Sequence, residues 1–152
     1  MNFPANSGPF IAVTGHNLLI MKPSGDFICV DASCLQNPGI TEWRGIRNRE
    51  IIFSEKLDYA TNNIGEFLAL CMAMEYRFTE GLDIPIYSDS YIALNWVKTR
   101  SPKTTLPYTF ENREVFEMLT HYTAKLADYS SSNIHHWKTK LWGEIPADYN
   151  RK

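Results

Sequence analysis

Three acidic residues lie at or beside apolar stretches of the sequence, where an ionisable side chain is unusual. Glu66 interrupts an apolar helical face, Asp31 ends one short apolar run, and Asp89 ends another. Carboxylates that lie close together repel one another, but a hard divalent cation such as Mg2+ removes this penalty. Two such ions about 4 Å apart can hold both the attacking and the leaving oxygen of a phosphodiester. If the fold brings these acids together, they indicate metal-dependent phosphodiester chemistry.

Each acid also has a purely structural interpretation. Glu66 lies three residues after Asn63, so the two could form a capping-box pair at the start of a helix. Asp31 could be a turn residue, Asp89 could cap the next helix, and Asp148 could be a solvated acid of the C-terminal tail. These interpretations weaken when they are taken jointly, because separate elements would carry their acids to one place.

The elements that must position the acids follow from apolar periodicity and turn residues. Two short strands are predicted at Phe10–Thr14 and Leu18–Lys22. Short connections then predict an antiparallel meander of three strands, and a crossover helix containing Glu66 leads to a fourth strand. Asn63 and Asn112 are predicted to cap the first and third helices. After residue 26 the predicted order is β-β-β-α-β-α-α-β, over residues 27–30, 40–47, 50–57, 63–79, 84–87, 91–99, 112–129 and 134–138.

This order of elements predicts an α/β domain with a mixed sheet. The strand after the crossover is expected to lie parallel to the first strand of the meander, through a right-handed connection. Parallel strands end at the same edge of a sheet, which is where open α/β sheets bind ligands. Asp31 and Asp89 would then lie side by side, and Glu66 on the first turn of the crossover helix would face them. Asp148 would complete the group if the tail packs back.

The composition is that of an ordinary globular domain. With 152 residues, of which 44% are apolar and 21% charged, the chain can bury a core as a single domain. The net charge of −2 and the pI near 6.1 are low for a protein with a large nucleic-acid footprint. Any binding of nucleic acid must therefore use a local patch, or metal ions that offset the acids.

Cysteine usage and hydropathy bear on the location of the protein. The cysteines, Cys29, Cys34 and Cys71, are odd in number and lack Cys-x-x-Cys spacing, which argues against disulfides and a cysteine zinc site. The apolar runs near the N-terminus are too short for a signal peptide or a membrane span. We therefore expect a cytoplasmic protein of a reducing compartment, with no membrane association.

The sequence contains the motifs Val30-Asp31-Ala32-Ser33, Asn37-Pro38-Gly39, Thr61-Asn62-Asn63 with Glu66, and Tyr87-Ser88-Asp89-Ser90. In combination, these motifs resemble ribonuclease H type 1. The ending Trp142–Lys152 is similar to one bacterial subgroup of that family, whose full-length members often carry an N-terminal hybrid-binding domain. The resemblance implies a catalytic domain over 27–152, with a mixed five-stranded sheet of three antiparallel and then two parallel strands, flanked by helices. Residues 1–26 would be an extension too short for the hybrid-binding domain.

The resemblance implies an endoribonuclease that hydrolyses the RNA strand of RNA–DNA hybrids and leaves 5′-phosphate and 3′-hydroxyl ends. The family uses two Mg2+ ions, for which Mn2+ is a possible substitute. By motif, Asp31 would bridge both ions, while Glu66 and Asp89 would hold the ion beside the leaving oxygen. Asp148 would hold the ion that activates water. Glu144 matches an extra acid of the subgroup, placed where other members carry a histidine on a flexible loop.

For the substrate, the resemblance implies contacts from loops and helix starts. Telling RNA from DNA requires contacts to the 2′-hydroxyl, which are expected from Asn37, Asn62 and the backbone of residues 34–37. Trp96 matches an aromatic residue that packs on a deoxyribose; its alternative is a core tryptophan. Hydroxyls and amides hold phosphate without reading the base, which suits a sequence-independent nuclease. The DNA-strand phosphate pocket is expected at Thr61, Asn63, Thr104 and Thr105.

Some residues depart from the family pattern. Ala32 stands where a glycine is common, Gln36 where a small residue lets the backbone approach RNA, and Tyr91 where a glutamine is frequent. The loop Ser101–Pro107 holds only Lys103 as a basic residue, so the basic protrusion of some relatives is missing. We expect weak, distributive binding of an RNA–DNA hybrid by a monomer that needs no protein partner.

Two other functions compete with this interpretation. One is a weakly active or non-catalytic module that binds hybrids or double-stranded RNA, which the complete set of acids disfavours. The other is a related enzyme on the same fold, such as a DNA-strand transferase or an exonuclease. The stretches Thr61-Asn62-Asn63 and Trp142-Gly143-Glu144 favour the ribonuclease.

Overall fold

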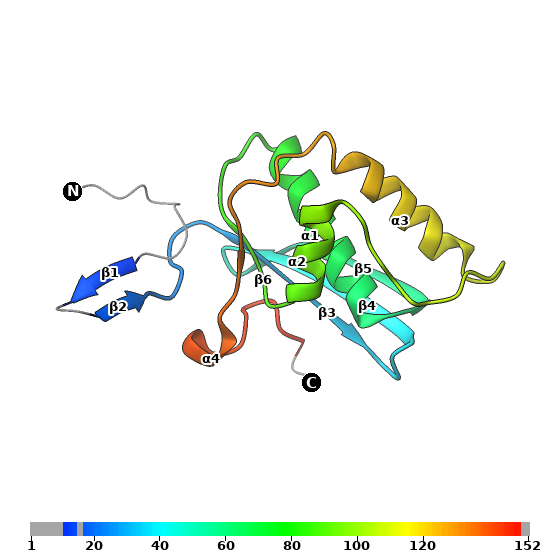
Figure 1. Cartoon of the computed structure of the whole chain (residues 1–152), viewed down its shortest axis with the longest axis horizontal. Coiled ribbons are helices and arrows are strands. Elements are labelled where there is room, and N and C mark those ends of the chain that lie inside the picture. Colours follow the sequence, from blue (N-terminus) through cyan, green and yellow to red (C-terminus); the bar gives the residue numbers. More distant parts are fainter. Residues whose placement is uncertain (1–10, 15–16, 150–152) are drawn as a thin grey trace.

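A computed structural model of the chain describes residues 11–14 and 17–149, and side chains from Met21 to Tyr149 (Figure 1). Strands β1 (Ile11–Thr14) and β2 (Asn17–Ile20) form a separate antiparallel pair. They correspond to the two short strands predicted near the N-terminus, although Phe10 lies outside the described residues. The last three residues of the predicted tail, 150–152, also lie outside them. No helix among the described residues is long and apolar enough to cross a membrane.

The main sheet has five strands in the order β5-β4-β3-β6-β7. The pairs β3–β4 and β4–β5 are antiparallel, whereas β3–β6 and β6–β7 are parallel, which confirms the predicted mixed sheet. The strands are β3 (Ile28–Cys34), β4 (Gly39–Arg47), β5 (Glu50–Ala60), β6 (Ile86–Ser88) and β7 (Ile134–His136). Strand β6, which follows the Glu66 helix, is therefore the parallel neighbour of β3, as expected.

Strand β3 is longer than its apolar run. The prediction ended it at Val30, but it continues to Cys34 because β4 pairs with it throughout, with Asp31 opposite Arg44 and Cys34 opposite Thr41. Its pairing with β6 covers only Ile28 and Cys29. Asp31 therefore lies within β3 rather than beyond its end. At the position of Asp31, β3 is paired with β4 but not with β6.

Four helices among the described residues accompany the sheet. They are α1 (Asn62–Thr79), α2 (Tyr91–Thr99), α3 (Arg113–Lys125) and α4 (Thr139–Trp142). Helices α2 and α3 begin where they were predicted, whereas α1 begins one residue earlier. The cap of α1 is Thr61, whose Oγ1 accepts a hydrogen bond from the Ile64 N–H at 3.2 Å, so the predicted Asn63 cap is wrong. Helix α3 begins after Asn112 as predicted, but the Asn112 side chain accepts from the Thr109 N–H instead of capping the helix.

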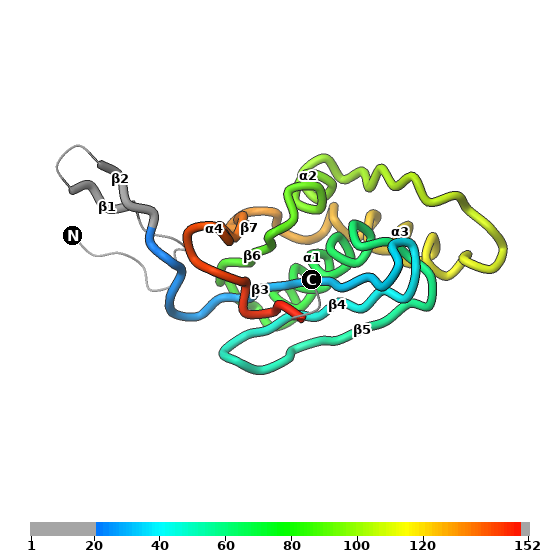
Figure 2. Tube along the Cα trace, turned by 90° about the horizontal axis from the view of Figure 1, so that it is seen from below, coloured from blue at the N-terminus to red at the C-terminus, as the bar shows by residue number. Residues whose placement is uncertain are grey.

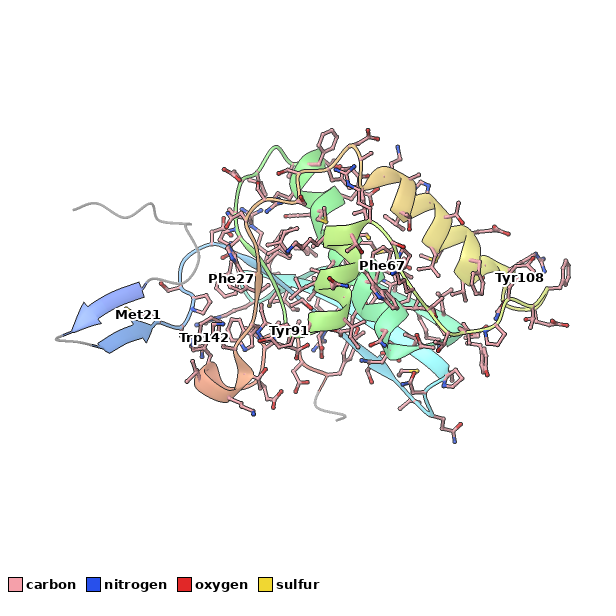
Figure 3. The ribbon with its side chains drawn as sticks, in the orientation of Figure 1. Met21, Phe27, Phe67, Tyr91, Tyr108 and Trp142 are labelled. Carbon is pink, nitrogen blue, oxygen red and sulfur yellow. The ribbon has the colours of Figure 1, made fainter. Side chains whose placement is uncertain are left out.

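The two faces of the sheet carry different cores. Alternate residues of a strand point to opposite faces, and Ile28, Val30 and Ala32 of β3 pack in the cluster that contains the apolar face of α1. Cys29 points the other way, into a cluster with aromatic and apolar residues of the C-terminal part. Figure 3 labels Trp142 of this cluster and the adjoining Phe27, at the end of the molecule away from Tyr108. Figure 2 shows the C-terminal segment running beside β3 and β4.

Candidate functional site

Asp31, Glu66 and Asp89 come together in the structure. Each offers a carboxylate oxygen, and the three oxygens lie within 4.8 Å of one another. Asp31 is 0% exposed and Glu66 is 1% exposed, while Asp89 is half-buried. The three acids come from β3, from the first turns of α1 and from the end of β6, so residues far apart in the sequence converge on one point.

The open side of β3 explains how Glu66 reaches Asp31. Asp31 shares a face of the sheet with Cys29, which is the face opposite α1. Because β6 pairs with β3 only as far as Cys29, a side chain from α1 can pass the edge of β3 and meet Asp31. The capping-box interpretation of Glu66 is excluded because the helix is capped by Thr61, two residues before Asn63.

Gly65 brings the start of α1 close to the sheet. A Cβ atom at this position would lie 2.7 Å from Cγ2 of Thr41 and 3.0 Å from Cβ of Ala32. Both distances are shorter than the usual carbon contact of about 3.5–4.0 Å. The missing side chain of Gly65 thus determines how far Glu66 extends towards Asp31.

Asp89 is held by the connection from β6 to α2. Strand β6 ends at Ser88, and α2 is capped by Ser90, whose Oγ accepts a hydrogen bond from the Ala93 N–H at 3.1 Å. The interpretation of Asp89 as the cap of α2 is therefore wrong, because Ser90 has that role. The Asp89 carboxylate is instead part of the acid group.

Asp148 and Glu144 lie on the C-terminal tail, outside the group of three acids. Ile145 and Ala147 of this tail are buried, so the tail packs back on the domain as the four-acid arrangement requires. Asp148 is half-buried and Glu144 is exposed. The backbone carbonyl oxygens of Ala147 and Asp148 accept hydrogen bonds from Arg44 of β4. No role was predicted for Arg44, because nothing local links a residue of β4 to a tail more than a hundred positions later.

The donor set fits a hard divalent cation. It consists only of carboxylate oxygens, the ligands that Mg2+ and Mn2+ accept, and two of the carboxylates are removed from water. Burial raises the pKa of the neighbouring Cys29 thiol to about 12, with a further increase from the charge of Asp31 and an opposing effect of the Ala147 backbone. The Cys29 sulfur is not among the ligand atoms that come together in this group, which are all carboxylate oxygens.

The predicted RNA-strand residues meet at the start of α1. The side-chain Oδ1 of Asn37, on the loop between β3 and β4, accepts a hydrogen bond from the backbone N–H of Asn62 at 3.0 Å. A Cβ at Gly39 would lie 1.9 Å from the Leu35 carbonyl oxygen, so this loop is tightly folded. The contact ties the loop to the helix that carries Glu66.

The other predicted substrate residues differ in exposure. Thr61 and Asn63 are half-buried at the start of α1. On the loop after α2, Thr105 is exposed, and the Thr104 Oγ1 accepts a hydrogen bond from the Leu106 N–H at 3.1 Å. The ring of Trp96 is 6% exposed and packs edge-on against Phe67 with the ring centres 5.9 Å apart, which matches the alternative of a core tryptophan.

A family model and several solved structures are similar to this chain. The RNase H family model matches residues 25–140. Among solved structures, RNase H1 from Halobacterium salinarum NRC-1 has 19% sequence identity and a TM-score of 0.48, over 76% of this chain and 87% of that chain. LC11-RNase H1, isolated from compost by a metagenomic approach, has 18% identity and a TM-score of 0.49, over 76% and 86%. The same enzyme in complex with an RNA/DNA hybrid has 16% identity and a TM-score of 0.42, over 76% and 87%. On the match of the family model, this chain belongs to the RNase H family.

Proposed function

We propose that this protein is a metal-dependent endoribonuclease that hydrolyses the RNA strand of RNA–DNA hybrids, giving 5′-phosphate and 3′-hydroxyl ends. The observation that carries the proposal is the convergence of Asp31, Glu66 and Asp89 within 4.8 Å in a chain of the RNase H family. Two buried carboxylates this close are costly for stability unless a cation offsets them, so their arrangement supports a binding role.

Asp31, Glu66 and Asp89 would hold divalent cations, with Mg2+ as the proposed ion and Mn2+ as a substitute. When bound, two such ions supply stabilisation of the attacking and leaving oxygens of the phosphodiester. The backbone of Asp31 is held by the pairing of β3 with β4, and the backbone of Glu66 is held by the close approach of α1 to the sheet at Gly65. The two acids are therefore in place before the substrate binds. We assign Asp148 to the water side of the scissile phosphate and the exposed Glu144 to a supporting role there.

The β3–β4 loop and the start of α1 would hold the RNA strand. Since the Asn37 Oδ1 accepts from the Asn62 N–H, its Nδ2 amide is the group available to donate to a ribose hydroxyl. The DNA-strand phosphates are assigned to Thr61, Asn63, Thr104 and Thr105. The Thr61 Oγ1 accepts from the Ile64 N–H, so its O–H remains a donor for a phosphate oxygen.

One gel tests the proposal against its alternatives. RNA–DNA hybrid, double-stranded RNA and double-stranded DNA, each labelled on one strand, are incubated with the protein and Mg2+, with and without EDTA. We expect cleavage of the RNA strand of the hybrid alone, abolished by EDTA. Binding of the hybrid without cleavage would support the binding module instead, and cleavage of the DNA duplex would support another nuclease of this fold.

A further inference from the structure

Arg44 binds the C-terminal tail at the point that carries Asp148. Its Nε donates to the carbonyl oxygen of Ala147 at 3.0 Å, and its Nη2 donates to the carbonyl oxygen of Asp148 at 2.9 Å. The guanidinium carbon also lies 4.4 Å from the ring centre of Tyr149. One side chain of β4 therefore contacts three consecutive residues of the tail.

The same arginine is the strand partner of Asp31. In the antiparallel pairing of β3 with β4, Asp31 lies directly opposite Arg44. Side chains of directly opposite residues project from the same face and are neighbours. Arg44 thus holds the backbone of Asp148 on the face of the sheet to which Asp31 points, and Figure 2 shows the tail running along this part of β3 and β4.

Apolar packing alone leaves the direction of the Asp148 side chain open. The tail after α4 has no strand or helix through Tyr149, and Ile145 and Ala147 anchor it by burial. The Asp148 N–H also donates to the Ile145 carbonyl oxygen at 2.9 Å, which closes a turn before Asp148. Neither burial nor this turn holds the carbonyl groups of Ala147 and Asp148. Two hydrogen bonds from one planar guanidinium to these successive carbonyl groups do hold them.

We propose that Arg44 is a positioning residue that directs the Asp148 carboxylate towards the group formed by Asp31, Glu66 and Asp89. The inference rests on the proposed function and extends it to a residue outside the acid group. Lysine at this position would keep the positive charge beside Asp31 but would lack the planar guanidinium group that donates hydrogen bonds to two carbonyl oxygens. An effect of charge and an effect of geometry are therefore separable by substitution.

A matched control lies on the same strand. Arg47 also uses its guanidinium for several contacts, with Nε and Nη2 donating to Asp26 at 2.9 and 2.7 Å and Nη1 donating to the Tyr76 hydroxyl at 3.0 Å. It does not contact the tail in any of these bonds. Loss of Arg47 therefore removes a partly buried arginine from β4 without touching Asp148.

The test compares Arg44→Lys, Arg44→Gln and Arg47→Gln with the wild type by hydrogen exchange and by cleavage of the hybrid at saturating Mg2+. In both Arg44 variants we expect amide hydrogen exchange over residues 143–149 to become about tenfold faster, since the two hydrogen bonds from Arg44 to this segment are lost. We expect kcat to fall about tenfold to a hundredfold, as for a displacement of about 1 Å at a reacting centre, with KM unchanged. Arg47→Gln should match the wild type in both measurements.

Wild-type kcat from Arg44→Lys would overturn the positioning role, and so would faster exchange of the tail without a fall in kcat. A fall in kcat for Arg44→Gln alone would assign the effect to charge rather than geometry and would also overturn it. The wild-type protein tests the proposed function separately. If the wild type does not cleave the hybrid, the proposed function fails. The differences between the variants and the wild type test the role of Arg44.

Discussion

Adding one methyl group at Gly65 should impair the proposed active site more than it destabilises the fold. The Cβ of Gly65→Ala would lie 2.7 Å from Cγ2 of Thr41 and 3.0 Å from Cβ of Ala32. A carbon contact of about 3.5 Å therefore requires the first turns of α1 to move by about 0.5–0.8 Å. Glu66 is the next residue, so this movement carries its carboxylate away from Asp31.

The two consequences have different magnitudes. Alanine in place of glycine favours a helix by up to about 1 kcal/mol, and overpacking of a core costs about 1–3 kcal/mol, so the net loss of unfolding free energy is about 0–2 kcal/mol. A displacement of about 1 Å at a reacting centre can reduce the rate about a hundredfold, which corresponds to about 2.7 kcal/mol. Activity should therefore fall more than stability.

A second substitution tests whether the contact is the cause. Thr41→Ser removes Cγ2, the nearest obstacle, and keeps the hydroxyl that donates to the Gly39 carbonyl oxygen at 3.0 Å. We expect Gly65→Ala to slow single-turnover cleavage of a labelled hybrid up to about a hundredfold, and Gly65→Ala with Thr41→Ser to recover most of the rate. Full activity of Gly65→Ala, or no recovery in the double variant, would refute the argument that this glycine positions Glu66.

Three further predictions follow from polar groups that are buried or half-buried. Glu66→Gln should lose activity while its melting temperature without metal is unchanged or higher, because one of three clustered charges is removed; a large fall in melting temperature with activity retained would restore a structural role. Arg77 is buried and donates to four backbone carbonyl groups, so Arg77→Met should lower the free energy of unfolding in urea by at least about 2 kcal/mol, and an unchanged value would contradict this. Burial lowers the pKa of His136, so its contribution to stability is full above the unfolded-state value of about 6.5 and is lost as pH falls towards the lowered pKa; His136→Phe should reduce the loss of stability between pH 7 and pH 5.

The antiparallel meander, its parallel neighbour β6 and the meeting of three acids could be predicted because they depend on local patterns. Short connections predict the antiparallel strands, and a crossover through a helix predicts the parallel neighbour β6. Asp31 and Asp89 lie on those two neighbouring strands, or directly after them, and Glu66 lies on the helix between them. Their convergence follows once the strands are adjacent.

The details that the prediction missed depend on contacts between distant segments. Thr61 and Asn63 are both good capping residues, and the sequence offers no local reason to prefer one. In the structure, the Asn37 side chain accepts from the Asn62 N–H, and this contact with a separate loop accompanies the earlier helix start at Thr61. The link from Arg44 to Asp148 spans 104 positions and has no sequence signature.

The most direct test measures hybrid cleavage by Asp31→Asn beside Asp58→Asn. Asp31 is buried at the centre of the acid group, whereas Asp58 is an exposed acid of β5. Charge stabilisation by a bound ion is worth several kcal/mol, so Asp31→Asn should cut the hybrid about a hundredfold more slowly or worse, while Asp58→Asn retains the wild-type rate. An Asp31→Asn protein that cleaves the RNA strand at the wild-type rate would contradict the assignment of this acid group as the active site.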